Sequence, residues 1–190
     1  MTMTIFISGS RVPGGINSLP NSVKKQLKII MEKKYNVIIG DANGIDYLIQ
    51  KYLSEHNYMR VSVYYSGSQP RNRANMQWKV YNFNDRGKRG KSLQELKDKK
   101  MSEKADIAYV VWTDTYINPR FGNKCVSSGT LSNVCRMISI KKKVVLYYIP
   151  NKKTYILSSY NDFNKNLCPI IDEIARRKFI KLSRQQVKLF

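Results

Sequence analysis

Short apolar runs of strand length alternate along this chain with segments whose apolar residues recur at helical spacing. The runs are Thr4 to Ser8, Tyr35 to Ile39, Val61 to Tyr65, Asp106 to Trp112 and Val144 to Tyr148. A run that is apolar on both faces is typical of a parallel strand buried between two layers of helices. Strands that alternate with helices favour a doubly wound α/β sheet. We therefore predict a Rossmann-like three-layer fold with a parallel sheet in the order 3-2-1-4-5.

The segments between the runs predict helices and two long loops. Ser18 is expected to cap the first helix, with Pro20 in its first turn. The polar stretches 66–91 and 113–128 are predicted to be loops, and loops of this length are usually functional or disordered. The apolar stripes that indicate helices lie within Val23 to Met31, Ile45 to Leu53, Leu93 to Met101 and Leu131 to Ile138.

The chain length sets the expected domain organisation. At 190 residues, one domain with an extension is the default. We predict a ligand-binding domain over residues 1–150. Residues 151–190 are predicted to be a partly helical C-terminal extension, with a last helix from Pro169 to Lys178.

Three of the apolar runs lead into loops that contain glycine. The first run ends in Ser8-Gly9-Ser10-Arg11, and the second leads into Gly40-Asp41-Ala42-Asn43-Gly44-Ile45-Asp46. The run that ends at Trp112 reaches Ser127-Ser128-Gly129-Thr130 after a loop. Glycine lets backbone N–H groups approach an anion, and a helix N-terminus favours negative charge. Because the carboxyl ends of parallel strands meet at one edge of a sheet, the loops together predict a site for a phosphate-bearing ligand.

Other residues are expected to complete this site. Arg11, Arg71 and Arg73 carry guanidinium groups that can grip a phosphate through paired hydrogen bonds. Trp112, at the end of its strand, is a candidate for stacking on a base, with a place in the core as the alternative. Ser128 has the alternative role of an ordinary helix cap. The predicted ligand contacts are Ser8, Gly9, Ser10, Arg11, Gly40, Asp41, Ala42, Gly44, Asp46, Arg71, Arg73, Trp112, Ser128, Gly129, Thr130 and Asn133.

The three glycine loops occur in the order and context seen in the SLOG superfamily, which the chain resembles over residues 4–149. This superfamily consists of Rossmann-like nucleotide-binding domains. It includes the LOG phosphoribohydrolases, the DNA-processing protein DprA and sensor domains of prokaryotic conflict systems. The resemblance implies that a nucleotide or nucleotide-derived small molecule binds over the strand ends. It also implies a homo-oligomer, a dimer or higher, because SLOG-type domains commonly form dimers.

One position departs from the LOG pattern. LOG enzymes carry a glutamate three residues after the threonine of Gly-Thr, where this chain has Asn133. An amide cannot act as a carboxylate base. We therefore expect binding, as a sensor or a sequestering protein, and assign no catalytic residue. The alternative is a nucleotide N-glycosidase of LOG type in which Asp41 or Asp46 supplies the acid.

The net charge keeps a third interpretation open. The chain has a formal charge of +21, and its basic excess is densest from Arg86 to Lys104. Such charge attracts polyanions and makes their binding depend on salt. Together with the similarity to DprA, it favours single-stranded nucleic-acid binding through the basic surface as an alternative. A solvated lysine-rich surface is the plain alternative.

Cysteine and histidine usage gives little sign of metal chemistry. Cys125, Cys135 and Cys168 are far apart, and His56 is the only histidine. We therefore predict no metal site and no cofactor. Free thiols, the absence of an apolar span and an N-terminus unlike a secretory signal predict a cytoplasmic protein without a membrane segment.

Overall fold

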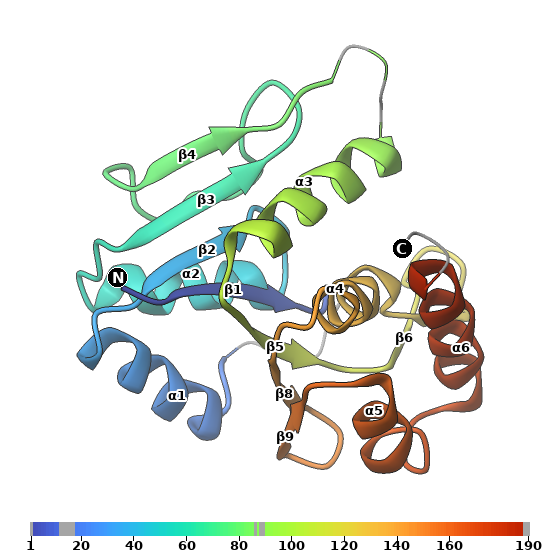
Figure 1. Cartoon of the computed structure of the whole chain (residues 1–190). Coiled ribbons are helices and arrows are strands. Elements are labelled where there is room, and N and C mark those ends of the chain that lie inside the picture. The colour runs from blue at the N-terminus through green and yellow to red at the C-terminus, as the bar shows by residue number, and fades with distance from the viewer. Residues whose placement is uncertain (1, 12–17, 86, 88–89, 188–190) are drawn as a thin grey trace.

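The computed structural model describes residues 2–11, 18–85, 87 and 90–187. Its centre is a seven-stranded sheet in the order β4-β3-β2-β1-β5-β8-β9 (Figure 1). The five predicted strands form the middle of this sheet with parallel pairing, and the predicted order 3-2-1-4-5 is confirmed. They are β1 (Thr4–Gly9), β2 (Asn36–Gly40), β3 (Val61–Tyr65), β5 (Ile107–Trp112) and β8 (Val144–Tyr148).

Two edge strands extend the sheet beyond the prediction. β4 (Lys79–Asn82) pairs in parallel with β3, and all four of its residues are exposed. β9 (Lys153–Leu157) pairs antiparallel with β8. Neither strand is a buried apolar run, because an edge strand contacts the core on at most one side. The prediction of a continuous loop over 66–91 is therefore wrong at β4.

Helices cover both faces of the sheet, as expected for three layers (Figure 1). Alternate residues of β1 face opposite layers: Ile5 and Ile7 belong to one buried cluster, and Phe6 to the other. On the side of Ile5 and Ile7 lie α1 (Asn21–Glu32) and α2 (Ile45–Glu55). The helices on the side of Phe6 are α3 (Gly90–Lys104), α4 (Ser128–Ser139), α5 (Tyr160–Asn166) and α6 (Glu173–Val187).

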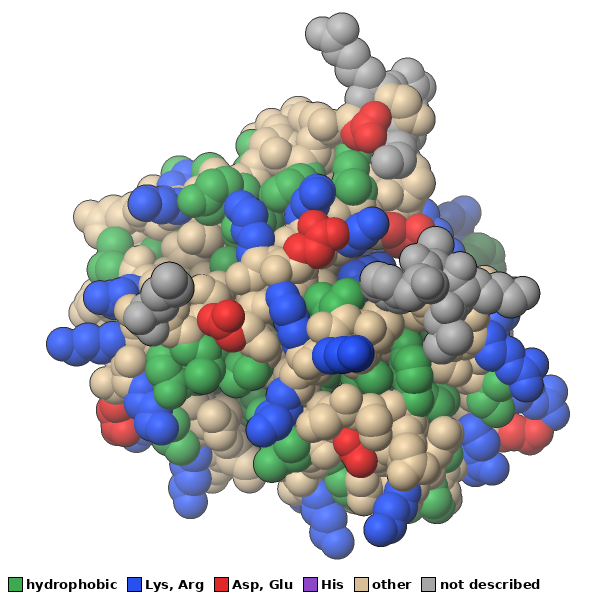
Figure 2. All heavy atoms as spheres, viewed as in Figure 1, with side chains coloured by type: hydrophobic (Ala, Val, Ile, Leu, Met, Phe, Trp, Pro, Cys, Tyr) green, Lys and Arg blue, Asp and Glu red, His purple; other side chains and the backbone are tan. Residues whose placement is uncertain are grey.

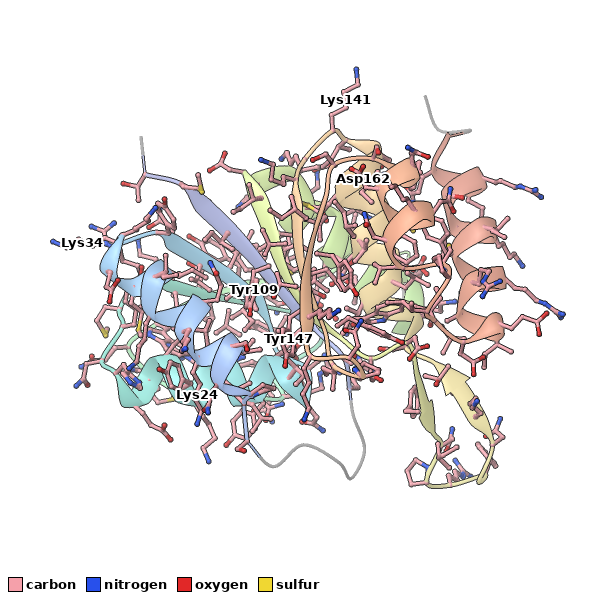
Figure 3. The ribbon with its side chains drawn as sticks, turned by 90° about the horizontal axis from the view of Figure 1, so that it is seen from below. Lys24, Lys34, Tyr109, Lys141, Tyr147 and Asp162 are labelled. Carbon is pink, nitrogen blue, oxygen red and sulfur yellow. The ribbon has the colours of Figure 1, made fainter. Side chains whose placement is uncertain are left out.

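Two local predictions need correction. α1 begins at Asn21 with Pro20 as its N-cap, so Ser18 does not cap it. Proline disfavours helical geometry in the residue before it, which keeps the helix from starting earlier. The loop 113–128 contains a two-stranded antiparallel sheet of β6 (Thr115–Ile117) and β7 (Lys124–Val126). This hairpin projects from the body of the molecule and is drawn in yellow-green at the lower right of Figure 3.

The residues after 150 share the core of the preceding ones. Phe163 of α5 stacks on Phe179 of α6 with ring centroids 3.9 Å apart, and Phe163 also contacts the ring of Trp112. A reciprocal capping box between Ser159 and Asp162 fixes the start of α5. We did not predict this helix from the sequence. α6 starts at Glu173, later than the predicted Pro169, and packs against α4. The boundary at residue 150 stays a prediction.

Candidate functional site

A cavity of about 850 Å³ lies where the glycine loops converge, at the carboxyl ends of β1 and β2. Helices α3, α4 and α6 supply much of its remaining wall, and Tyr116 of β6 and Val126 of β7 also line it. This is the edge of a doubly wound sheet at which ligands bind, next to the switch in strand order between β1 and β5. The predicted residues that line it are Ser8, Gly9, Arg11, Gly40, Ala42, Asp46, Arg71, Ser128, Gly129, Thr130 and Asn133.

The N-terminus of α4 opens into this cavity without a cap of its own. Its N-cap residue is Ser127, whose hydroxyl donates to the Ser10 hydroxyl at 2.8 Å and makes no bond to the helix. Within the described part of the chain, the N–H groups of Ser128, Gly129 and Thr130 have no hydrogen-bond partner. A Cβ added at Gly129 would meet no atom within 4 Å. These donors are therefore accessible to an anion in the cavity.

In the second loop, the carboxyl group of Asp46 lies where we expected an anion-binding site. The backbone N–H of Gly9 donates to Oδ1 of Asp46 at 2.8 Å. A Cβ at Gly40 would lie 2.9 Å from Oδ2 of Asp46 and 3.3 Å from Nζ of Lys97. Burial raises the pKa of Asp46 to about 7, although the charge of Lys97 opposes the shift. Asp46 thus occupies the Gly9 donor and presents a carboxyl group that is partly protonated at neutral pH.

Asp41 is a structural anchor for the wall of the cavity. Its carboxylate accepts two bonds from the Arg71 guanidinium, at 2.9 and 2.6 Å, and one from the Arg71 backbone N–H at 3.1 Å. Nζ of Lys97 lies 3.7 Å from Oδ1 of Asp41. Burial acts to raise the pKa of Asp41, but the bonds from Arg71 and the nearby cations outweigh it, so the pKa is lowered. Arg71 lines the cavity, yet its guanidinium is largely committed to Asp41.

Five predicted contacts do not line the cavity: Ser10, Asp41, Gly44, Arg73 and Trp112. Trp112 is fully buried, and its indole N–H donates to the carbonyl of Ser127, so it has no free face for a base. The Arg73 guanidinium donates to the carbonyls of Met76 and Trp78 in its own loop. The expected roles, base stacking for Trp112 and phosphate binding for Arg73, are therefore corrected, because the indole and guanidinium groups are used within the fold.

Ser10 and Gly44 act on the loops that shape the site. The Ser10 hydroxyl accepts from the N–H of Thr113 at 3.0 Å and from the Ser127 hydroxyl, so it joins the first and third loops. Gly44 has a φ of 85° and is the N-cap of α2. A residue with a side chain rarely adopts this backbone conformation, which explains the glycine there.

Asn133 belongs to a network of neutral and cationic groups. Its amide nitrogen donates to the Ser8 hydroxyl at 3.0 Å, and its amide oxygen accepts from Arg136 at 2.7 Å. An amide makes both bonds because it has a donor and an acceptor, whereas a carboxylate has acceptors only. Asn133 therefore positions Arg136 at the cavity wall.

The sequence interpretation missed the cavity residues on α3 and α6, and it missed Ser132 and Arg136 on α4. Lys97 is buried between Leu93 and Met101 on the inner side of α3. The position of Lys97, four residues after Leu93 and four before Met101, could have indicated this. A lysine on an apolar helix face predicts a charged partner, because an unpaired lysine is seldom buried. Lys178 and Lys181 lie beyond the region of family resemblance, so no motif drew attention to them.

The lining of the cavity is more basic than acidic. Its cations are Arg11, Arg71, Lys91, Lys97, Arg136, Lys178 and Lys181, and its acids are Asp46, Glu95 and Asp98. By contrast, the charge on the face in Figure 2 is dispersed, with Lys and Arg side chains spread widely and acids among them. The described ranges hold no group of three or more His, Cys, Asp or Glu residues that could ligate a metal ion. Among those ranges, no helix has the length and apolar character that crossing a membrane requires.

Comparisons with known proteins bear on the fold. No protein-family model and no curated protein matched the chain. A solved structure, described as the molybdenum cofactor carrier protein MCP from Chlamydomonas reinhardtii, is similar over 99% of both chains, with a TM-score of 0.53 and 14% identity. Similarity at this identity concerns the fold alone. The chain thus has a mainly parallel Rossmann-like fold shared with that carrier protein, and the shared fold includes the residues after 150.

Proposed function

We propose that this protein binds a phosphorylated nucleotide or nucleotide-derived small molecule, as a sensor or a sequestering protein. The observation that carries the proposal is the uncapped N-terminus of α4, which offers the N–H groups of Ser128, Gly129 and Thr130 to the cavity. The free N–H groups at a helix N-terminus, together with the helix dipole, are sufficient to form a phosphate-binding site. The basic lining strengthens the attraction for an anion.

Two further observations support this function. The volume of about 850 Å³ lies within the range of roughly 300–1,000 Å³ that is usual for small-molecule sites. The protein of similar fold is named as a cofactor carrier, which is a binding role rather than a catalytic one. The glycine loops and the fold together favour membership of the SLOG superfamily, which we include in the proposal.

A substitution at Gly129 separates phosphate binding from folding. Gly129→Asp places a carboxylate among the proposed phosphate donors, where like charges about 4 Å apart repel by about 4 kcal/mol at an effective dielectric of 20. An acid in the first turn stabilises a helix by about 0.3–1 kcal/mol, and the position has room for a side chain. We therefore expect an unchanged or higher melting temperature and at least about a thirtyfold loss of affinity for phosphorylated ligands.

The matched control is Gly129→Asn, which has nearly the same shape without the charge. Affinities are measured by calorimetry against the 5′-monophosphates of adenosine, guanosine, cytidine and uridine, with the four nucleosides as phosphate-free comparators. The proposal expects tight binding of at least one monophosphate by the wild type and the Asn variant. Equal affinity of the Asp and Asn variants would place the phosphate elsewhere.

A second function, cleavage of the N-glycosidic bond of the bound nucleotide, is favoured by Asp46 alone. A buried carboxyl group that lines the cavity and has a pKa of about 7 is suited to general acid or base catalysis near neutral pH. Mass spectrometry of the nucleotide after incubation decides between the two functions. Recovery of the intact nucleotide supports binding, whereas release of free base that Asp46→Asn abolishes would establish the enzyme.

A further inference from the structure

A group of three cations lines the same cavity as the proposed phosphate site. It consists of Arg136 of α4 and of Lys178 and Lys181 of α6, and we call it the α4–α6 cation group. The two helices pack against each other on the same side of the sheet (Figure 1). Leu182, adjacent to Lys181, is buried in the core cluster that contains Leu131 and Val134 of α4. This packing fixes the position of α6 beside α4.

These cations are not neutralised within the described residues. No described carboxylate oxygen lies within 4 Å of the side-chain nitrogens of Arg136, Lys178 or Lys181. The Arg136 guanidinium donates to the neutral amide of Asn133. Burial lowers the pKa of Arg136, and the more distant charges of Asp98 and Glu95 oppose this shift. A partly buried cation without an ion pair is unfavourable, and an anionic ligand would relieve it.

Asp98 and Glu95, two acids that line the cavity, pair with other cations, so the α4–α6 cation group remains available to an anionic ligand. Asp98 of α3 lies 3.3 Å from Nζ of Lys97, so its charge is engaged on its own helix. Glu95 lies 3.9 Å from Lys91 across one helical turn. Both acids line the cavity, but neither forms an ion pair with the α4–α6 cation group in the described structure.

Arg136 of the α4–α6 cation group is also set apart from the first turn of α4. Gly129 and Arg136 are seven residues apart, which is about 10 Å along a helix axis. The Arg136 side chain leans back only as far as Asn133, one turn away from Gly129. The backbone of Arg136 is therefore about two helical turns from a phosphate held by the N–H groups of the first turn. The cavity volume, toward the upper end of the usual range, leaves room for a ligand larger than a mononucleotide.

We propose that the α4–α6 cation group binds a second phosphate, so that the ligand is a nucleotide with more than one phosphate group. This inference rests on the proposed function, because it places the first phosphate at the N-terminus of α4. It assigns a ligand-binding role to α6, the last helix of the chain. The distinguishing feature of the ligand is its additional negative charge.

The test compares a monophosphate with two bisphosphorylated probes. For the base whose 5′-monophosphate binds most tightly, calorimetry measures the 5′-monophosphate, the 5′-diphosphate and the 3′,5′-bisphosphate. Hydrogen bonds to charged groups are stronger than those between neutral groups, so at least one probe with two phosphates should bind at least tenfold more tightly than the monophosphate. Lys178→Gln with Lys181→Gln should abolish that gain, so that this variant binds the probe with two phosphates no more tightly than it binds the monophosphate.

The control is Arg176→Gln with Arg184→Gln, which removes two charges from the same helix at exposed positions outside the cavity lining. This variant should keep the gain. If a monophosphate binds in a Gly129-dependent manner but the second phosphate adds nothing, or if its gain survives the change of both lysines, the inference is overturned and the proposed function stands. If no nucleotide binds in a Gly129-dependent manner, both are overturned.

Discussion

Replacing Gly9 by alanine is expected to lower the free energy of unfolding by about 3–5 kcal/mol, an effect at the upper end for a single methyl group. A Cβ at Gly9 would lie 2.2 Å from Cγ2 and 2.3 Å from Cβ of Ile45. Ile45 is fully buried at the start of α2, so it cannot turn aside. The end of β1 and the start of α2 must separate to admit the methyl group, and the bond from Gly9 to Asp46 weakens with that movement.

Urea denaturation of the purified variants measures this loss. Gly129→Ala is the matched control, because its added methyl group meets no atom within 4 Å and alanine favours a helix over glycine by about 0.5–1 kcal/mol. The control should be as stable as the wild type or more so. A Gly9→Ala variant within about 1 kcal/mol of the wild type would show that β1 and α2 are not in such close contact.

The second large effect is a pH-dependent gain in stability from Asp46→Asn. Burial raises the pKa of Asp46 in the folded protein to about 7, from an ordinary value of 3.8. Between these pH values the unfolded chain has released the proton while the folded chain retains it. The contribution of Asp46 to stability is therefore complete below pH 4 and is lost as the pH rises to about 7. Asparagine does not titrate, so it makes no pH-dependent contribution to stability. Relative to the wild type, the free energy of unfolding of the variant therefore rises across this range, by up to about 4 kcal/mol.

Unfolding free energies at half-unit steps from pH 4.5 to pH 8.5 reveal this difference. Asparagine retains an oxygen that can accept from the N–H of Gly9, so the local structure should persist. Asp162→Asn is a useful comparison because the pKa of Asp162 is lowered by hydrogen bonds, first that from the Ser158 N–H. Parallel curves for the wild type and Asp46→Asn would show that Asp46 is ionised throughout this range.

Burial explains which parts of the fold could be predicted. The strands β1, β2, β3, β5 and β8 lie inside the sheet, and their apolar runs follow from that position. β4 is exposed along its whole length, and β9 has one buried residue, Leu157. Edge strands leave little hydrophobic pattern in a sequence, so both were missed.

The same reasoning applies to the candidate site. Glycine loops can be predicted from local sequence, and the structure brings Gly9, Gly40 and Gly129 to one cavity. The use of each donor could not be predicted, because it depends on partners distant in sequence. Asp46 takes the N–H of Gly9 from 37 residues away, and Ser127 turns its hydroxyl to Ser10 instead of capping α4. Lys178 and Lys181 reach the cavity only because α6 packs against α4.

A nuclear magnetic resonance titration of ¹⁵N-labelled protein tests the anion-binding role of α4 most directly. The probe is the nucleoside 5′-monophosphate that binds most tightly, and the matching nucleoside serves as the reference. The backbone amide signals of Ser128, Gly129 and Thr130 should shift in a saturable manner with the monophosphate and far less with the nucleoside. Saturable binding of the monophosphate that leaves these three amide signals in place would contradict the account.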